Sequence, residues 1–185
     1  MNLTFGPALG VFQNALVYNT VTIDARRYWD FTHGYTFYTR MLGGWSSGQN
    51  PQTFRIGGFS TLRGYPDLDL LATSVMLTTV ELRFPFIQQL GLVGPVPLGG
   101  LNLRGVVFAD AGALWNQGQH LRLWQWNGGH PVLDDPRRGP GTGLDFGTGI
   151  RTTFLYMIMK LDVAWPTNLE DVGRPRWNFS IGPEF

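Results

Sequence analysis

The feature that most constrains the fold of this chain is the alternation of apolar and polar residues along most of its length. A period of two is that of a β-strand, whose successive side chains point to opposite faces of a sheet. The last nine residues show the pattern well: Trp177, Phe179, Ile181, Pro183 and Phe185 fall on one face, and Asn178, Ser180, Gly182 and Glu184 on the other. The pattern predicts an all-β fold whose strands each have one apolar and one polar face.

Alternation of the same kind recurs in seven earlier segments, which predicts eight strands. The segments are 2–9, 17–26, 35–41, 76–86, 101–110, 144–154 and 157–165. Long connections rich in Gly, Pro and Asn separate some of them, the first at about 43–70. We therefore interpret residues 1–185 as a single domain, a length that suits one domain.

The polar faces of the predicted strands distinguish a membrane protein from a soluble one. Charged residues make up 15% of the chain, against about 25% in soluble domains. The cations are 13 Arg and one Lys, Lys160, whereas a soluble surface uses Lys freely. An enclosed, hydrogen-bonded lumen with a lipid-facing exterior fits this composition, so we predict a transmembrane antiparallel β-barrel. A soluble β-sandwich, which also alternates, is the alternative.

Aromatic residues gather near the strand ends, as the two interfaces of a bilayer favour. We predict two rims. One rim comprises Tyr28, Trp29, Phe84, Phe86, Phe154, Tyr156 and Phe185, and the other comprises Trp45, Trp115, Trp165 and Trp177.

The glycine-rich stretch from Phe54 to Tyr65 is the strongest functional signal. It places Arg63 beside Gly64 and Tyr65, between two strand-like segments. A guanidinium on a loop that folds into a lumen needs a buried carboxylate, and the following strands offer Glu81 and Asp110. We expect Arg63 to pair with Asp110, with Glu81 nearby. The alternative is a solvated loop arginine without a fixed partner.

Four segments together resemble the C-terminal barrel of the bacterial surface antigen superfamily, which includes the BamA and TamA outer-membrane assembly factors. Residues 57–65, ending in Leu-Arg-Gly-Tyr, are similar to the family loop that enters the lumen. Residues 80–85 resemble the next strand with its inward Glu, and Phe-Ala-Asp-Ala-Gly at 108–112 resembles the strand whose Asp receives the loop Arg. Residues 147–166 and the Phe-terminated end resemble the last three strands. The resemblance begins at about residue 16.

The resemblance implies a sixteen-stranded barrel with five strands after the loop, of which this chain would supply half. It implies insertion or translocation of proteins across the outer membrane, with unfolded outer-membrane or secreted proteins as clients. A passive structural barrel or membrane anchor is the alternative. Trp177, Phe179, Ile181 and Phe185 would form the terminal-strand signal for delivery to the membrane. An even strand number predicts both termini in the periplasm, and the missing strands would come from upstream sequence or a second copy.

The sequence offers little for chemistry. His33, His120 and His130 lack metal-ligand spacing, no motif suggests a cofactor, and the net charge of +1 argues against a nucleic-acid partner. Glu81 and Asp110 could act as an acid–base pair, but nearby Arg residues favour structural ion pairs, so we do not expect an enzyme. Arginines at 137–138, 174 and 176 could contact lipopolysaccharide phosphates or simply keep the loops soluble. Outer-membrane lipid and lipopolysaccharide are the expected surroundings.

Overall fold

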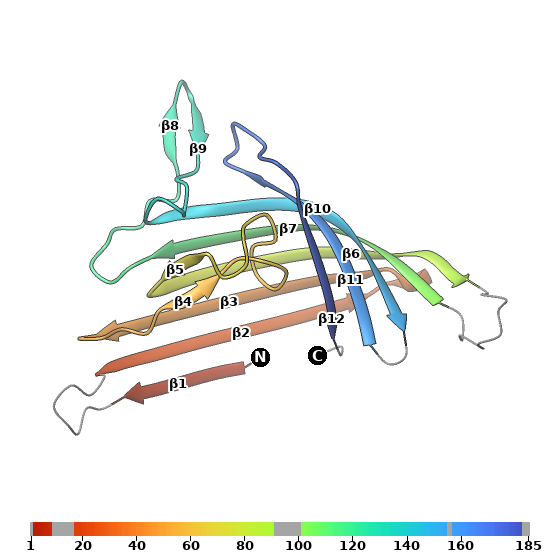
Figure 1. The fold of residues 1–185 in the computed structure, drawn as a ribbon, viewed down its shortest axis with the longest axis horizontal. Helices are drawn as coiled ribbons and strands as arrows, with labels where there is room; N and C mark the ends of the chain where they lie inside the picture. Colours follow the sequence, from red (N-terminus) through yellow and green to blue (C-terminus); the bar gives the residue numbers. More distant parts are fainter. Residues whose placement is uncertain (1, 9–16, 91–100, 155–156, 183–185) are drawn as a thin grey trace.

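The computed structural model describes residues 2–8, 17–90, 101–154 and 157–182, and it is dominated by one curved antiparallel sheet (Figure 1). The sheet has eight strands in the order β1-β2-β3-β6-β7-β10-β11-β12. Their bounds are β1 Asn2–Ala8, β2 Tyr18–Asp30, β3 Thr36–Gly48, β6 Ser74–Leu90, β7 Leu101–Trp115, β10 Gly141–Phe154, β11 Met157–Thr167 and β12 Arg176–Gly182. The prediction of an all-β fold is confirmed. Among the described residues, no helix is long and apolar enough to cross a membrane.

Exposure alternates along the strands as the sequence predicts. On β6, Met76, Leu82 and Phe86 are exposed, whereas Leu77 and Glu81 are buried. Trp177, Phe179 and Ile181 of β12 are exposed in the same way. The apolar side chains therefore cover the outer face of the sheet, and the polar ones lie on the inner face, beneath the loop that follows β3.

The connections sort to two sides of the sheet. The β2–β3 turn contains only the short 3-10 helix η1 (Thr32–Gly34), and we call this the short-turn side. On the opposite side, which we call the long-loop side, residues 116–140 include a small hairpin of β8 (Gln125–Asn127) and β9 (His130–Val132). Because neighbouring strands are antiparallel, β1 begins and β12 ends on the short-turn side.

The loop expected at about 43–70 starts later than the sequence suggests. Strand β3 continues to Gly48, because residues 42–48 still pair with β2 and keep its alternation. The segment that leaves the main sheet is 49–73, which we call the inward loop. It contains two short paired strands, β4 (Phe54–Ile56) and β5 (Leu70–Ala72), lying over the sheet (Figure 1).

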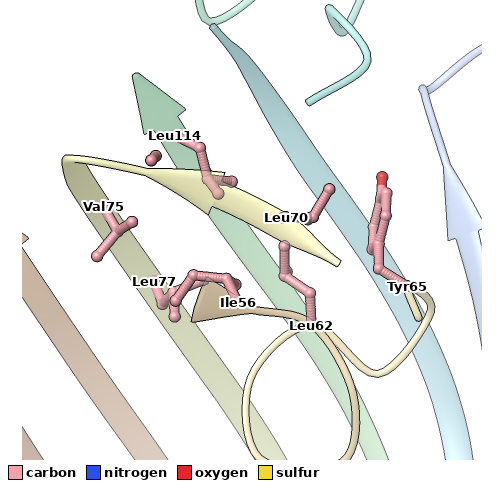
Figure 2. Packing of buried hydrophobic residues seen from close by; sticks show 8 residues of the cluster. Ile56, Leu62, Tyr65, Leu70, Val75, Leu77 and Leu114 are labelled. Atoms are coloured by element: carbon pink, nitrogen blue, oxygen red, sulfur yellow. The ribbon is translucent and has the colours of Figure 1, made fainter. Parts of the chain in front are cut away.

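The main hydrophobic core lies between the inward loop and the sheet (Figure 2). Leu62 is fully buried, and Tyr65 is nearly so. The loop contributes Ile56, Leu62, Tyr65, Leu70 and Ala72, and the sheet contributes Val75, Leu77 and Leu114. Full burial of a large apolar side chain contributes about 1.5–3 kcal/mol to stability. With eight buried side chains, this contact is therefore the chief apolar attachment of the loop.

One of the predicted aromatic rims needs a correction. Tyr28 does not face outward: its ring lies 4.7 Å from that of Tyr38, a buried residue of the inner face, and near the Arg83 guanidinium. Tyr28 occupies an even-numbered position of β2, like the inward Asp24, so the strand period itself turns it inward. Tyr156 and Phe185 of that rim lie outside the described residues.

The two edge strands determine whether the sheet forms a barrel. Among the described residues, β1 pairs only with β2 and β12 only with β11, so the sheet is open between them. The transmembrane barrel, of which these strands would form half, therefore remains a prediction.

Candidate functional site

The inward loop turns tightly at its glycines. Gly58 has a φ of 85°, a left-handed conformation that glycine adopts without strain. Its N–H donates to the carbonyl of Leu62 at 3.0 Å, and the N–H of Gly57 donates to the Thr61 hydroxyl at 2.8 Å. These bonds close a compact turn that directs the next residue, Arg63, at the inner face of the sheet.

Arg63 is bound by carboxylates from three strands. Its Nε and Nη2 donate to the two oxygens of Asp110 on β7, at 2.7 and 3.0 Å. Its Nη1 donates to Glu81 on β6 at 2.8 Å and to Asp162 on β11 at 3.4 Å. The Arg63 side chain is only 4% exposed, so these are desolvated, charge-assisted bonds, of which the fork on Asp110 is bidentate.

Two further arginines share the same carboxylates. Arg151 on β10 pairs with both oxygens of Asp162, through Nη2 at 2.9 Å and through a closer Nη1 contact. Arg83 donates through Nε to Glu81 at 3.0 Å. The Arg63 guanidinium also lies 3.4 Å from the ring centroid of Phe108. Arg151 Nη2 also lies 3.9 Å from Glu81 Oε1, so Glu81 serves three cations and Asp162 serves two. This sharing fixes the positions of all of them. We call Arg63, Arg83, Arg151, Glu81, Asp110 and Asp162 the lumen cluster.

Gly64 lets the loop backbone approach the sheet closely. Its N–H donates to Asp145 on β10 at 2.9 Å. A Cβ at this position would lie 2.7 Å from the Cβ of Asp145, closer than real Cβ atoms come to other atoms, and a tight 3.0 Å from the Pro166 nitrogen. Tyr65, next along the chain, packs in the apolar core beneath the loop. The three residues Arg63, Gly64 and Tyr65 thus perform separate tasks: charge pairing, close approach and apolar burial.

The terminal strand contacts the loop through its polar face. The Asn178 side-chain amide donates to the Arg63 backbone carbonyl at 2.9 Å. The apolar residues expected to form a terminal signal, Trp177, Phe179 and Ile181, lie on the opposite, exposed face, whereas Phe185 lies outside the described residues. The strand therefore joins the loop on one side and presents an apolar row on the other.

The order of loop, receiving strands and terminal strand is that of a known family. The model of the Omp85 superfamily domain matches residues 1–185. The chain belongs to the Omp85 superfamily. The match includes β1 and extends the resemblance expected from about residue 16 to the whole chain. A search of curated proteins and a search of solved structures give no significant match.

Omp85 membership fixes the general class of this protein. The superfamily belongs to the bacterial outer membrane and consists of assembly and transport factors rather than enzymes. Its members work with outer-membrane components and protein substrates. No group of three His, Cys, Asp or Glu side chains among the described residues is arranged to hold a metal ion.

Four members of the site were not singled out from the sequence. Asp145, Asp162 and Arg151 were recognisable only as polar residues of inward strand faces, and Asn178 as one of several on β12. The signal that could have found them is register: Asp145 lies directly opposite Asp110, and Asp162 lies opposite Asn178. Register places these residues in one layer of the sheet, but it depends on loop geometry that the sequence does not display.

The arginines of the long-loop side are partly engaged. Arg137 donates from both its backbone N–H and its guanidinium to Asp135. Partial burial by itself would raise the pKa of Asp135, but these hydrogen bonds and the nearby charge outweigh it, so the pKa lies below its usual value. Arg138 is much more exposed, and its Nε lies 4.0 Å from the same carboxylate. Contact with lipopolysaccharide phosphates stays the less favoured interpretation of these residues, after a role in loop solubility.

Proposed function

We propose that this chain is a barrel-forming part of an Omp85 machine that inserts or translocates proteins across the outer membrane. The observation that carries the proposal is the Arg63 site: a loop arginine held on the inner face by carboxylates of β6, β7 and β11. Such a constellation needs a site shielded from bulk water, which the lumen of a barrel provides, because desolvated ion pairs are strong only where water is excluded. Superfamily membership supports the same class of function.

We further propose that additional strands complete the barrel. Open sheet edges do not occur within lipid, because each unpaired backbone group costs several kcal/mol there. An eight-stranded barrel has an interior only wide enough for side chains, whereas the inner face here already carries a loop with its own pair of strands. Strands from elsewhere in the protein or from a second copy would cover the edges of β1 and β12 and leave room for the loop. In this arrangement the short-turn side, with both termini, faces the periplasm.

The test is reconstitution of the purified protein in liposomes, followed by addition of an unfolded outer-membrane protein. We expect faster folding of the client than in empty liposomes, measured by protease protection. Arg63→Ala should reduce the acceleration, and Arg174→Ala, in the exposed 168–175 connection, should not. A correctly folded protein that gives no acceleration would favour the alternative, a passive barrel or membrane anchor.

A further inference from the structure

The inner face contains a cavity between the inward loop and the short-turn side. It has a volume of about 440 Å³, within the range of ligand sites. Its walls combine guanidinium groups with the rings of Tyr28, Tyr38 and Phe59. It lies below Arg63, on the side of the sheet where β12 ends, and is lined there by Ser180, Ile181 and Gly182.

Among the described residues that line this cavity, cations outnumber carboxylates. Six cationic side chains line it: Arg26, Arg40, Arg63, Arg83, Arg151 and Lys160. Glu81 is the one carboxylate among the lining residues. Ion pairs among the described residues join these cations to the carboxylates of Asp24, Glu81, Asp110 and Asp162, and Asp24 is shared by Arg26 and Arg40.

Lys160 is the cation without a counterion in this arrangement. Among the described residues, no carboxylate lies within ion-pair distance of its amine. Its direct cross-strand neighbours are Arg151 on β10 and Ser180 on β12. Like charges directly opposite each other on one face destabilise a sheet, so the arrangement of Arg151 and Lys160 is one that a bound anion would stabilise.

A similar arrangement occurs on the other wall of the cavity. Arg26 of β2 lies directly opposite Arg40 of β3, and Asp24 alone bridges them. The excess cations thus come from strands on both sides of the cavity and cannot all converge on one small anion. Several anionic groups spaced along one chain would match them better.

We infer that this cavity binds an acidic, extended peptide segment, so that the client chains it accepts carry carboxylates spaced along an unfolded stretch. The tyrosine and phenylalanine rings supply apolar contact for the side chains between those carboxylates. The inference rests on the proposed function, since it assigns the cavity to client chains arriving on the short-turn side.

The experiment measures binding rather than transport. The purified protein in a non-ionic detergent is titrated into a short fluorescent peptide rich in Glu, and anisotropy is recorded. The same peptide with Gln in place of Glu is the uncharged control. We expect the Glu peptide to bind and the Gln peptide to bind at least several-fold more weakly, with the difference shrinking at high salt.

Matched variants locate the site. Lys160→Gln should weaken binding of the Glu peptide by roughly fivefold. That loss in affinity lies between what an exposed ion pair and what a hydrogen bond to a charged group contribute. Lys160→Arg should restore it. Arg174→Gln removes the same charge from an exposed connection and should leave affinity unchanged. Equal affinity for both peptides, or equal loss in the Lys160→Gln and Arg174→Gln variants, would overturn the inference.

Competition separates the peptide from other anions. At constant ionic strength, displacement by inorganic phosphate but not by chloride would assign the site to a small anion. Displacement by phosphatidylglycerol micelles would assign it to a lipid head group, and either result refutes the peptide. The reconstitution assay remains independent: client folding without peptide binding refutes this inference alone, and peptide binding without client folding refutes the proposed function alone.

Discussion

Removal of the Arg63 side chain should destabilise the protein more than any other single change in the inward loop. Truncation to Ala would leave three buried carboxylates, Asp110, Glu81 and Asp162, without their shared partner. Breaking a buried ion pair from one side costs roughly 3–5 kcal/mol. Arg83 and Arg151 remain to compensate Glu81 and Asp162, so most of the loss falls on Asp110. We therefore expect about 3–4 kcal/mol.

The partner change should cost less. Asp110→Ala leaves Arg63 bonded to Glu81 at 2.8 Å and close to Asp162. The Arg63→Ala/Asp110→Ala double variant should then be less destabilised than the sum of the single variants, by about 1–3 kcal/mol, the range for residues in one network. The coupling identifies the pair itself rather than a general effect on the loop.

The assay is urea unfolding in detergent micelles or bilayers, followed by tryptophan fluorescence and by gel mobility of unheated samples. Arg63→Lys, which retains the charge but loses the bidentate fork, should fall between wild type and Arg63→Ala. Arg174→Ala is the control for loss of one positive charge. Strictly additive single variants would refute the argument, because they would mean that Arg63 and Asp110 stabilise the protein independently.

Three further changes test other parts of the structure with the same unfolding assay. Leu161→Arg, on the exposed outer face, should cost about 2–4 kcal/mol in a bilayer, whereas Thr79→Arg on the inner face should cost less; equal costs would contradict the assignment of faces. Gly64→Ala should cost about 1–3 kcal/mol because its Cβ would meet Asp145 and Pro166; Gly43→Ala, with nothing within 4 Å, should be nearly neutral, and a similar loss in both would refute the close-approach argument. Asp145→Asn keeps an acceptor for the Gly64 N–H and should be tolerated better than Asp145→Ala; the reverse order would show that this bond contributes nothing.

Alternation was sufficient to predict the long strands of the main sheet and their faces, because a period of two follows directly from strand geometry. It did not predict the short strands β4, β5, β8 and β9, which lie in the connections. It could not place the start of the inward loop, since residues 42–48 continue the alternation of β3 into a stretch rich in Gly and Ser. The rim assignment of Tyr28 failed for another reason: its position at a strand end suggested the rim, whereas the same period of two places it on the inner face. The local pattern gives the face of the sheet on which a residue lies, but not where the strand that contains it ends.

The Arg63 partners show the same limit. Asp110 and Glu81 could be proposed from the sequence because the motif order pointed to them, and the structure places both within 3.0 Å of the Arg63 guanidinium. Asp162 could not be proposed in this way, because it lies 99 positions from Arg63 along the chain. It reaches Arg63 only through the pairing of β10 with β11 and the curvature of the sheet. A sequence pattern contains neither of these.

The attachments of the inward loop are unevenly distributed over the sheet. Its polar contacts reach β6, β7, β10, β11 and, through Asn178, the terminal strand β12. On the other side, Arg40 of β3 donates to the Ser60 carbonyl at 2.8 Å, and the N–H groups of Gln49 and Asn50 donate to the Val17 carbonyl just before β2. No polar contact among the described residues joins the loop to β1. The loop therefore stabilises one part of the sheet and leaves the β1 edge dependent on its pairing with β2. Since an edge strand held by backbone pairing alone separates at a lower free-energy cost than one with an additional side-chain bond to a buried loop, we expect β1 to separate from this sheet more readily than β12, which Asn178 ties to the loop.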